Sequence, residues 1–154
     1  MMKQQGYSLL EVLISVVVMA IGMLGIAALQ ANAIRYNQSA QLRAIAITQV
    51  GNMADRMLAN STGIDAGAYD NISGIPSNPS CSPCSSTLVA QRDAFEWNTL
   101  NAQLLPNGQG TVTRNGTRLL ITMRWDNGRT GVTGLNCSGI PTVDLTCLSM
   151  EVQL

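Results

Sequence analysis

Histidine is absent from this chain of 154 residues, and Lys3 is the only lysine. Histidine is the commonest general base and the commonest metal ligand, so its absence argues against much of catalysis and metal binding. Nine basic residues balance nine acidic ones, whereas general nucleic-acid-binding proteins usually carry a basic excess. The sequence also contains no evident nucleophile–base pair, phosphate-binding loop or pair of catalytic carboxylates. We therefore expect no enzyme, no metal, no cofactor and no nucleic-acid partner.

Charge is missing altogether from the 23 residues between Val12 and Ile34. As a helix rising about 1.5 Å per residue, this run reaches about 35 Å, which is enough to cross a hydrocarbon core of about 30 Å. The apolar part of a secretory signal peptide has only about 7–15 residues, so the length favours a permanent single-pass anchor. Lys3 and the amino terminus place positive charge before the run, which predicts a cytoplasmic N-terminus and an exported remainder.

Glu11 stands at the start of this run, where an ionised carboxylate is costly. Such a group costs about 2.5–3.5 kcal/mol at the centre of a membrane helix, and it usually has a functional partner. Lys3 is eight residues away, and nothing nearer in the chain can pair with the acid. We expect the partner to come from another molecule or to be created by processing.

The stretch from Lys3 to Glu11, KQQGYSLLE, followed by a long apolar helix resembles the type III signal of type IV pilin-like proteins. The resemblance implies that a prepilin peptidase removes the leader, residues 1–6, by cutting between Gly6 and Tyr7. Tyr7, where the family usually has phenylalanine, then becomes the N-methylated residue. The resemblance also gives Glu11 a role in assembly. Its carboxylate pairs with the Tyr7 amine of a neighbouring subunit, since a buried charge is tolerated only when paired.

The helical pattern continues beyond the apolar run and becomes amphipathic. The apolar residues of one face recur at steps of three and four: Leu42, Ala46, Val50, Met53 and Met57. No proline interrupts the pattern, and Asn60-Ser-Thr-Gly63 is typical of a helix end, so we expect one helix from about Ser8 to about Ala59. The stretch Met53–Asn60 also resembles the end of this helix in PilV-type minor pilins.

The remaining sequence predicts a loop, a short helix and a small sheet. Residues 61–87 are rich in glycine, proline and serine and predict a loop. A helix is expected over 88–105, with an apolar face made of Ala90, Ala94, Trp97, Leu100 and Leu104. Three strands are expected over 110–114, 117–125 and 146–154, with Asn115-Gly116 as the turn of the first hairpin.

Alternation of apolar and polar residues indicates that each of the last two strands has one apolar face. Leu119, Ile121, Met123 and Trp125 share the apolar face of the middle strand. An antiparallel sheet with one apolar face needs a cover, and the second half of the long helix can supply it. The predicted fold class is therefore α+β, with a long N-terminal helical spine packed against a small antiparallel sheet. The pilin resemblance implies the same architecture.

Four cysteines form two close pairs in the sequence: Cys81 with Cys84, and Cys137 with Cys147. For an exported domain we expect two disulfides with local pairing, although four cysteines allow three connectivities. Two alternatives remain open. Cys81-Ser-Pro-Cys84 has the spacing of a redox C-x-x-C pair, and it could also form half of a zinc site.

Four arginines near the predicted hairpin have only one acid among them: Arg114, Arg118, Arg124 and Arg129. They could form a surface for DNA or for an acidic partner, but such arginines more often belong to the solvated face of a sheet. No aromatic residues accompany them, so stacking on single-stranded nucleic acid is not supported.

We therefore expect a minor pilin that helps to prime assembly of a type IV pilus and supports twitching motility and adhesion. Its expected parts are the leader 1–6, a transmembrane and filament-core helix 7–34, and a periplasmic globular domain 35–154. Expected partners are the prepilin peptidase, other minor and major pilins, and the inner membrane before the subunit moves to the surface pilus. The alternatives are a minor pseudopilin of type II secretion and a membrane-anchored thiol oxidoreductase.

Overall fold

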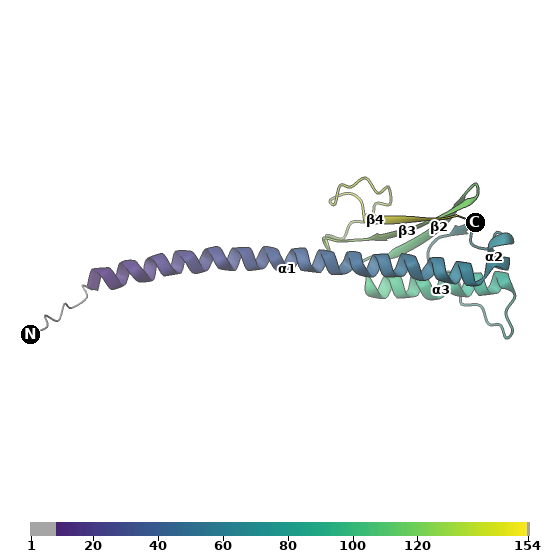
Figure 1. Cartoon of the computed structure of the whole chain (residues 1–154), viewed down its shortest axis with the longest axis horizontal. Helices are drawn as coiled ribbons and strands as arrows, with labels where there is room; N and C mark the ends of the chain where they lie inside the picture. Colours follow the sequence, from purple (N-terminus) through teal and green to yellow (C-terminus); the bar gives the residue numbers. More distant parts are fainter. Residues whose placement is uncertain (1–8, 154) are drawn as a thin grey trace, which may run out of the picture. The chain divides into compact units, whose positions relative to one another are not determined.

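A computed structural model describes residues 9–153 of the chain (Figure 1). The chain divides into two compact units, one ending at Gln38 and the other starting at Ser39. Its elements are α1 (Leu9–Ala59), α2 (Ser61–Asp65), β1 (Asn71–Ile72), α3 (Ser86–Leu104), β2 (Gln109–Asn115), β3 (Arg118–Trp125) and β4 (Thr146–Gln153). From Ser39 on, α1 packs against a four-stranded antiparallel sheet. The predicted α+β fold, a long helix packed against a small sheet as in pilin-like proteins, is confirmed.

Helix α1 ends at Ala59, as the sequence predicts, while the expected start near Ser8 lies outside the described residues. The five residues of the predicted apolar face, from Leu42 to Met57, are all buried. Asn60 ends the helix and caps the next one, because its Oδ1 accepts a hydrogen bond of 3.2 Å from the Gly63 backbone nitrogen.

Two short elements interrupt the segment 61–87, which the sequence predicts to be a loop. Helix α2 has only five residues, and β1 has two. Strand β1 exists through pairing with a strand 40 residues away, since Asn71 lies opposite Thr113 and Ile72 opposite Val112. Such pairing leaves no periodic signal in two residues, which explains why the sequence pattern did not predict it.

Helix α3 begins two residues earlier than predicted, because Ser85 acts as its N-cap. Burial of Ala90, Ala94 and Trp97 confirms part of the predicted face. The placement of Leu100 and Leu104 on that face was wrong, because both side chains are exposed. Two asparagines, Asn98 and Asn101, are buried near this end of the helix instead.

Asn98 explains why a polar residue occupies a core position of α3. Its Nδ2 donates to the carbonyl oxygens of Gly74, at 2.6 Å, and Gly110, at 3.1 Å. Its Oδ1 accepts from the backbone nitrogen of Gly110 at 2.8 Å. The side chain thus satisfies buried backbone groups that no apolar residue could satisfy.

The sheet has the order β1-β2-β3-β4, and all neighbours are antiparallel. The predicted turn at Asn115-Gly116 was displaced by one residue, because Asn115 pairs with Arg118 and leaves Gly116 and Thr117 as the turn. Gly116 has a φ of 62° at the first turn position, as in type II′ hairpins. The glycine therefore sits one place earlier in the turn than the Asn-Gly pattern predicts.

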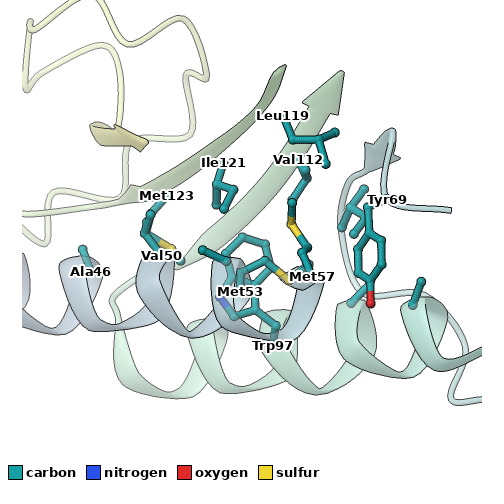
Figure 2. Packing of buried hydrophobic residues seen from close by; sticks show 14 of the residues in the cluster. Ala46, Val50, Met53, Met57, Tyr69, Trp97, Val112, Leu119, Ile121 and Met123 are labelled. Atoms are coloured by element: carbon teal, nitrogen blue, oxygen red, sulfur yellow. The ribbon is translucent and has the colours of Figure 1, made fainter. Parts of the chain in front are cut away.

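The core lies between the inner face of the sheet, the second part of α1, and α3 (Figure 2). Leu119, Ile121, Met123 and Trp125, the predicted apolar face of β3, are buried. Trp97 enters the same core from α3, and its indole Nε1 donates to the Gln49 carbonyl of α1 at 2.8 Å. This bond satisfies the polar end of a side chain that is otherwise surrounded by apolar groups.

A polar network joins α1 to α3 beside this core. Arg56 donates from Nη1 to Asp93, at 3.0 Å, and to Glu96, at 2.8 Å. Burial alone would lower the pKa of Arg56, but hydrogen bonds to Glu96 and Asp93 raise it overall. Tyr69 donates to the other Asp93 oxygen at 2.6 Å, and burial followed by this bond raises the Tyr69 pKa. Arg56 therefore stays cationic and Tyr69 stays a neutral hydrogen-bond donor across the neutral pH range.

Candidate functional site

The N-terminal part of α1 exposes an apolar surface on every side. All side chains from Leu9 to Gln38 are exposed, including the large apolar ones up to Ile34. A helix that is apolar all round needs an apolar environment, either lipid or other helices. Within the described residues, α1 is the one helix long and apolar enough to cross a membrane. The stretch from Leu9 to Ile34 is therefore the candidate site for insertion and assembly.

Glu11 lies in the first turn of α1 and is exposed. No ion pair joins it to another residue within 9–153. The position can be compared with Ser15, one turn later, whose Oγ donates to the Val12 carbonyl at 2.8 Å. Ser15 satisfies its hydroxyl inside the helix, whereas the carboxyl group of Glu11 faces whatever surrounds the helix.

The predicted cleavage and methylation residues, Gly6 and Tyr7, lie outside the described residues. The roles of both residues stay predictions.

All four cysteines of the chain form disulfides in the structure, Cys81 with Cys84 and Cys137 with Cys147. The structure thus adopts the local pairing among the three connectivities. Cys84 directly precedes Ser85, the N-cap of α3, and Arg92 Nη1 lies 3.7 Å from the Cys84 sulfur. The Cys137–Cys147 bond ties the loop between β3 and β4 to the second residue of β4.

Two buried aspartates organise this loop, which spans residues 126–145. Asp126 accepts from the Gly131 backbone nitrogen at 2.7 Å and from the Thr130 hydroxyl at 3.4 Å. Asp144 accepts from the backbone nitrogens of Asn136 and Ser138 at 3.4 and 3.2 Å. Neither aspartate was predicted from the sequence to form a loop. The signal was Asp126-Asn-Gly-Arg-Thr-Gly131, a pattern typical of turns built around an aspartate side chain.

The same hydrogen bonds set the charge state of both aspartates. Burial raises the pKa of Asp126, but backbone donors at 128, 130 and 131 outweigh it and lower the pKa overall. Hydrogen bonds from Ser138 lower the pKa of Asp144 against the smaller opposing effect of burial. Both carboxylates are therefore ionised at neutral pH.

We expect the loop to make the protein acid-sensitive. Each folded-state pKa lies below the unfolded value of about 3.9, so the stabilisation is complete above that value and is lost as pH falls through the folded-state pKa. The melting temperature of the full chain in detergent should be constant from about pH 7 to pH 5 and fall below about pH 4. Asp126→Asn should melt lower than the unaltered chain at pH 7, and the difference should shrink in acid.

Asp55→Asn, a change at an exposed position on α1, is the matched control and should leave the curve unchanged. A difference between Asp126→Asn and the unaltered chain that stays constant down to pH 2 would contradict this account.

The four arginines do not form one basic surface. Arg114 pairs with Asp70, at 2.6 Å, and Arg118 with Glu151, at 2.9 Å. Arg124 donates to the Leu135 carbonyl and the Thr111 hydroxyl at 3.1 and 2.9 Å, and its burial lowers its pKa. Three of the four side chains are thus occupied in bonds within the sheet and its loops, while Arg129 is exposed. The arrangement supports the structural interpretation over a site for DNA.

One family model, the prokaryotic N-terminal methylation motif, matches residues 1–27. The match covers Gly6, Tyr7, Glu11 and the first part of α1. No curated protein and no solved structure matches the chain. The N-methylation motif of type IV pilin-like prepilins is therefore present at the start of this sequence.

Proposed function

We propose that this chain, which carries the N-methylation motif of type IV pilin-like prepilins, is a minor pilin that helps to prime assembly of a type IV pilus. The observation that carries the proposal is the motif over residues 1–27, continuous with a helix whose apolar side chains are exposed on every side. The motif supports a pilin-like or pseudopilin protein, and a globular unit with a helix against a four-stranded sheet fits either.

The proposed maturation starts at the membrane. A prepilin peptidase removes residues 1–6 by cutting between Gly6 and Tyr7, and Tyr7 is then N-methylated. Residues 7–34 hold the subunit in the inner membrane with its N-terminus in the cytoplasm, and residues 35–154 form the periplasmic domain. Intact mass measurement of the purified subunit should give a chain that starts at Tyr7 with one added methyl group. A chain that starts at Met1, or beyond Tyr7, would contradict the proposal.

In the assembled state, α1 leaves the lipid and packs among the helices of neighbouring pilins. The resemblance of Met53–Asn60 to PilV-type proteins supports a place beside other minor pilins in a priming complex. Through that complex the subunit would support pilus display, and with it twitching motility and adhesion. Exposed apolar helices can exchange lipid for helix contacts at little hydrophobic cost, because both environments are apolar.

Deletion of the gene tests the pilus role against the main alternative, a minor pseudopilin of type II secretion. Surface pili, twitching and secreted enzymes are scored in the same strain, and the intact gene is returned as a control. We expect pili to be lost or much reduced while secretion stays normal. Normal pili with lost secretion would replace the proposal by the pseudopilin alternative.

A membrane-anchored thiol oxidoreductase is the second alternative, and one contact favours it. Cys84 lies just before the N-terminus of α3, and the guanidinium of Arg92 lies 3.7 Å from its sulfur. A helix N-terminus and a nearby arginine can each stabilise a thiolate. Trapping of thiols in the native protein decides the matter. A structural disulfide stays unlabelled, whereas a redox centre would give a fraction of labelled Cys81 and Cys84 that changes with the redox potential of the buffer.

A further inference from the structure

The loop between β3 and β4 displays three large apolar side chains. Leu135, Ile140 and Val143 are 51%, 52% and 56% exposed. The only charged residues between 127 and 147 are Arg129, which is exposed, and Asp144, which is buried. The accessible surface of this loop therefore combines three large apolar side chains with uncharged polar ones, such as Asn136, Ser138 and Thr142, and a single positive charge. This combination suits the boundary between lipid headgroups and acyl chains.

The loop is held in position, so its apolar side chains cannot retreat by local collapse. Arg124 Nε binds the Leu135 carbonyl at 3.1 Å, and Asn107 Nδ2 binds the Val132 carbonyl at 3.0 Å. The disulfide and the two buried aspartates described above fix its other turns. Because the loop is fixed, these three apolar side chains stay available to an apolar partner.

The second residue of the loop lies beside the start of the globular unit. Asn127 Nδ2 donates to the Ser39 hydroxyl at 2.9 Å, and Ser39 is the first residue of that unit. Arg35, the first charge after the apolar run, lies four residues before Ser39. Four residues span at most about 14 Å even when fully extended, so chain length alone keeps the base of the loop close to the membrane surface.

We propose that residues 127–145 rest on the lipid interface of the leaflet on the side of the globular unit. This inference rests on the proposed membrane-anchored subunit. Leu135, Ile140 and Val143 enter the boundary between headgroups and acyl chains, and Arg129 faces the lipid phosphates. The contact holds the globular unit against the membrane until α1 moves into a filament.

Tryptophan fluorescence can test the contact in the full chain. The two native tryptophans, Trp97 and Trp125, are 0% and 2% exposed, so they are shielded from quenchers. The probes are Leu135→Trp and Ile140→Trp, each in the full chain reconstituted into vesicles of phosphatidylcholine and phosphatidylglycerol. Brominated acyl chains report contact with lipid, and aqueous iodide reports exposure to water.

Leu58→Trp is the matched control. Leu58 is 61% exposed on α1, and it lies 19 residues after Ser39, about 29 Å along the helix. We expect Leu135→Trp and Ile140→Trp to be quenched by the brominated lipids and to show about fivefold less iodide quenching than Leu58→Trp, because an ion is excluded from the apolar layer. Near-ultraviolet circular dichroism in each variant checks that the fold is retained.

Flotation of the vesicles separates the two levels of the proposal. If the chain floats but both loop probes are quenched by iodide as strongly as Leu58→Trp, the loop contact is overturned and the anchor stands. If the loop probes are shielded from both quenchers, protein covers the loop and the lipid assignment is overturned. If the chain does not float with the vesicles, the anchor fails and the loop contact fails with it.

Discussion

Glu11→Ala is expected to lower incorporation of the subunit into filaments at least about tenfold while leaving leader cleavage intact. Removing one partner of a buried ion pair costs about 3–5 kcal/mol, and each 1.4 kcal/mol is a factor of ten. Glu11 is exposed on a helix that otherwise presents apolar side chains, so its charge needs a partner once lipid or neighbouring helices surround it. The proposed partner is the amine that cleavage creates at Tyr7.

Three variants make the measurement specific. Glu11→Gln keeps the shape of the side chain and removes its charge, so it should fail like Glu11→Ala. Glu11→Asp keeps a carboxylate and should retain part of the incorporation. Ser15→Ala, one turn along the same helix, removes a hydroxyl that already bonds within the helix and should assemble normally. Immunoblots of purified filaments give the amount of incorporated subunit, and immunoblots of membranes give the amount of cleaved subunit. Normal amounts of Glu11→Ala in filaments would contradict the proposed ion pair.

Gly110→Ala is expected to destabilise the globular unit by about 1–3 kcal/mol, the usual cost of overpacking a core. A Cβ atom at Gly110 would run into the six-membered ring of the Trp97 indole. The strand cannot move away, because Asn98 holds both backbone polar groups of Gly110. The indole is held as well, because it is fully buried and bonded to the Gln49 carbonyl at 2.8 Å.

A double-mutant cycle tests whether the ring causes this cost. Phenylalanine lacks the indole atoms that the new Cβ would meet, so Gly110→Ala should cost at most about half as much in a Trp97→Phe background. Gly51→Ala is the control, because the added Cβ meets no atom within 4 Å beyond the adjacent residues and the neighbouring backbone of its own helix, and it should stabilise α1 by about 0.5–1 kcal/mol. Urea unfolding of the full chain in detergent measures the unaltered chain, the two single variants of the cycle and the double variant. Additive costs at Gly110 and Trp97 would show that the explanation is wrong.

Local signals predicted much of the fold. The predicted buried faces of α1 and β3 were both confirmed. Each face follows from a short repeat along the chain, of three to four residues in a helix and of two in a strand. The prediction from apolar spacing was wrong where hydrogen bonds of polar side chains decide which residues are buried. Apolar spacing placed Leu100 and Leu104 on the core face of α3, but Asn98 and Asn101 are buried there instead. Asn98 is held in the core by hydrogen bonds to the carbonyls of Gly74 and Gly110.

The candidate site, too, was determined partly by local sequence and partly by tertiary structure. The motif over residues 1–27 is contiguous, and the apolar run can be recognised without a fold, so the sequence by itself determined the bounds of the candidate segment for insertion and assembly. Only the tertiary structure decided that three of the four arginines are occupied and that the loop between β3 and β4 begins beside Ser39. Each of these needs residues far apart in the chain to come within hydrogen-bonding distance, and spacing along the sequence does not encode that proximity.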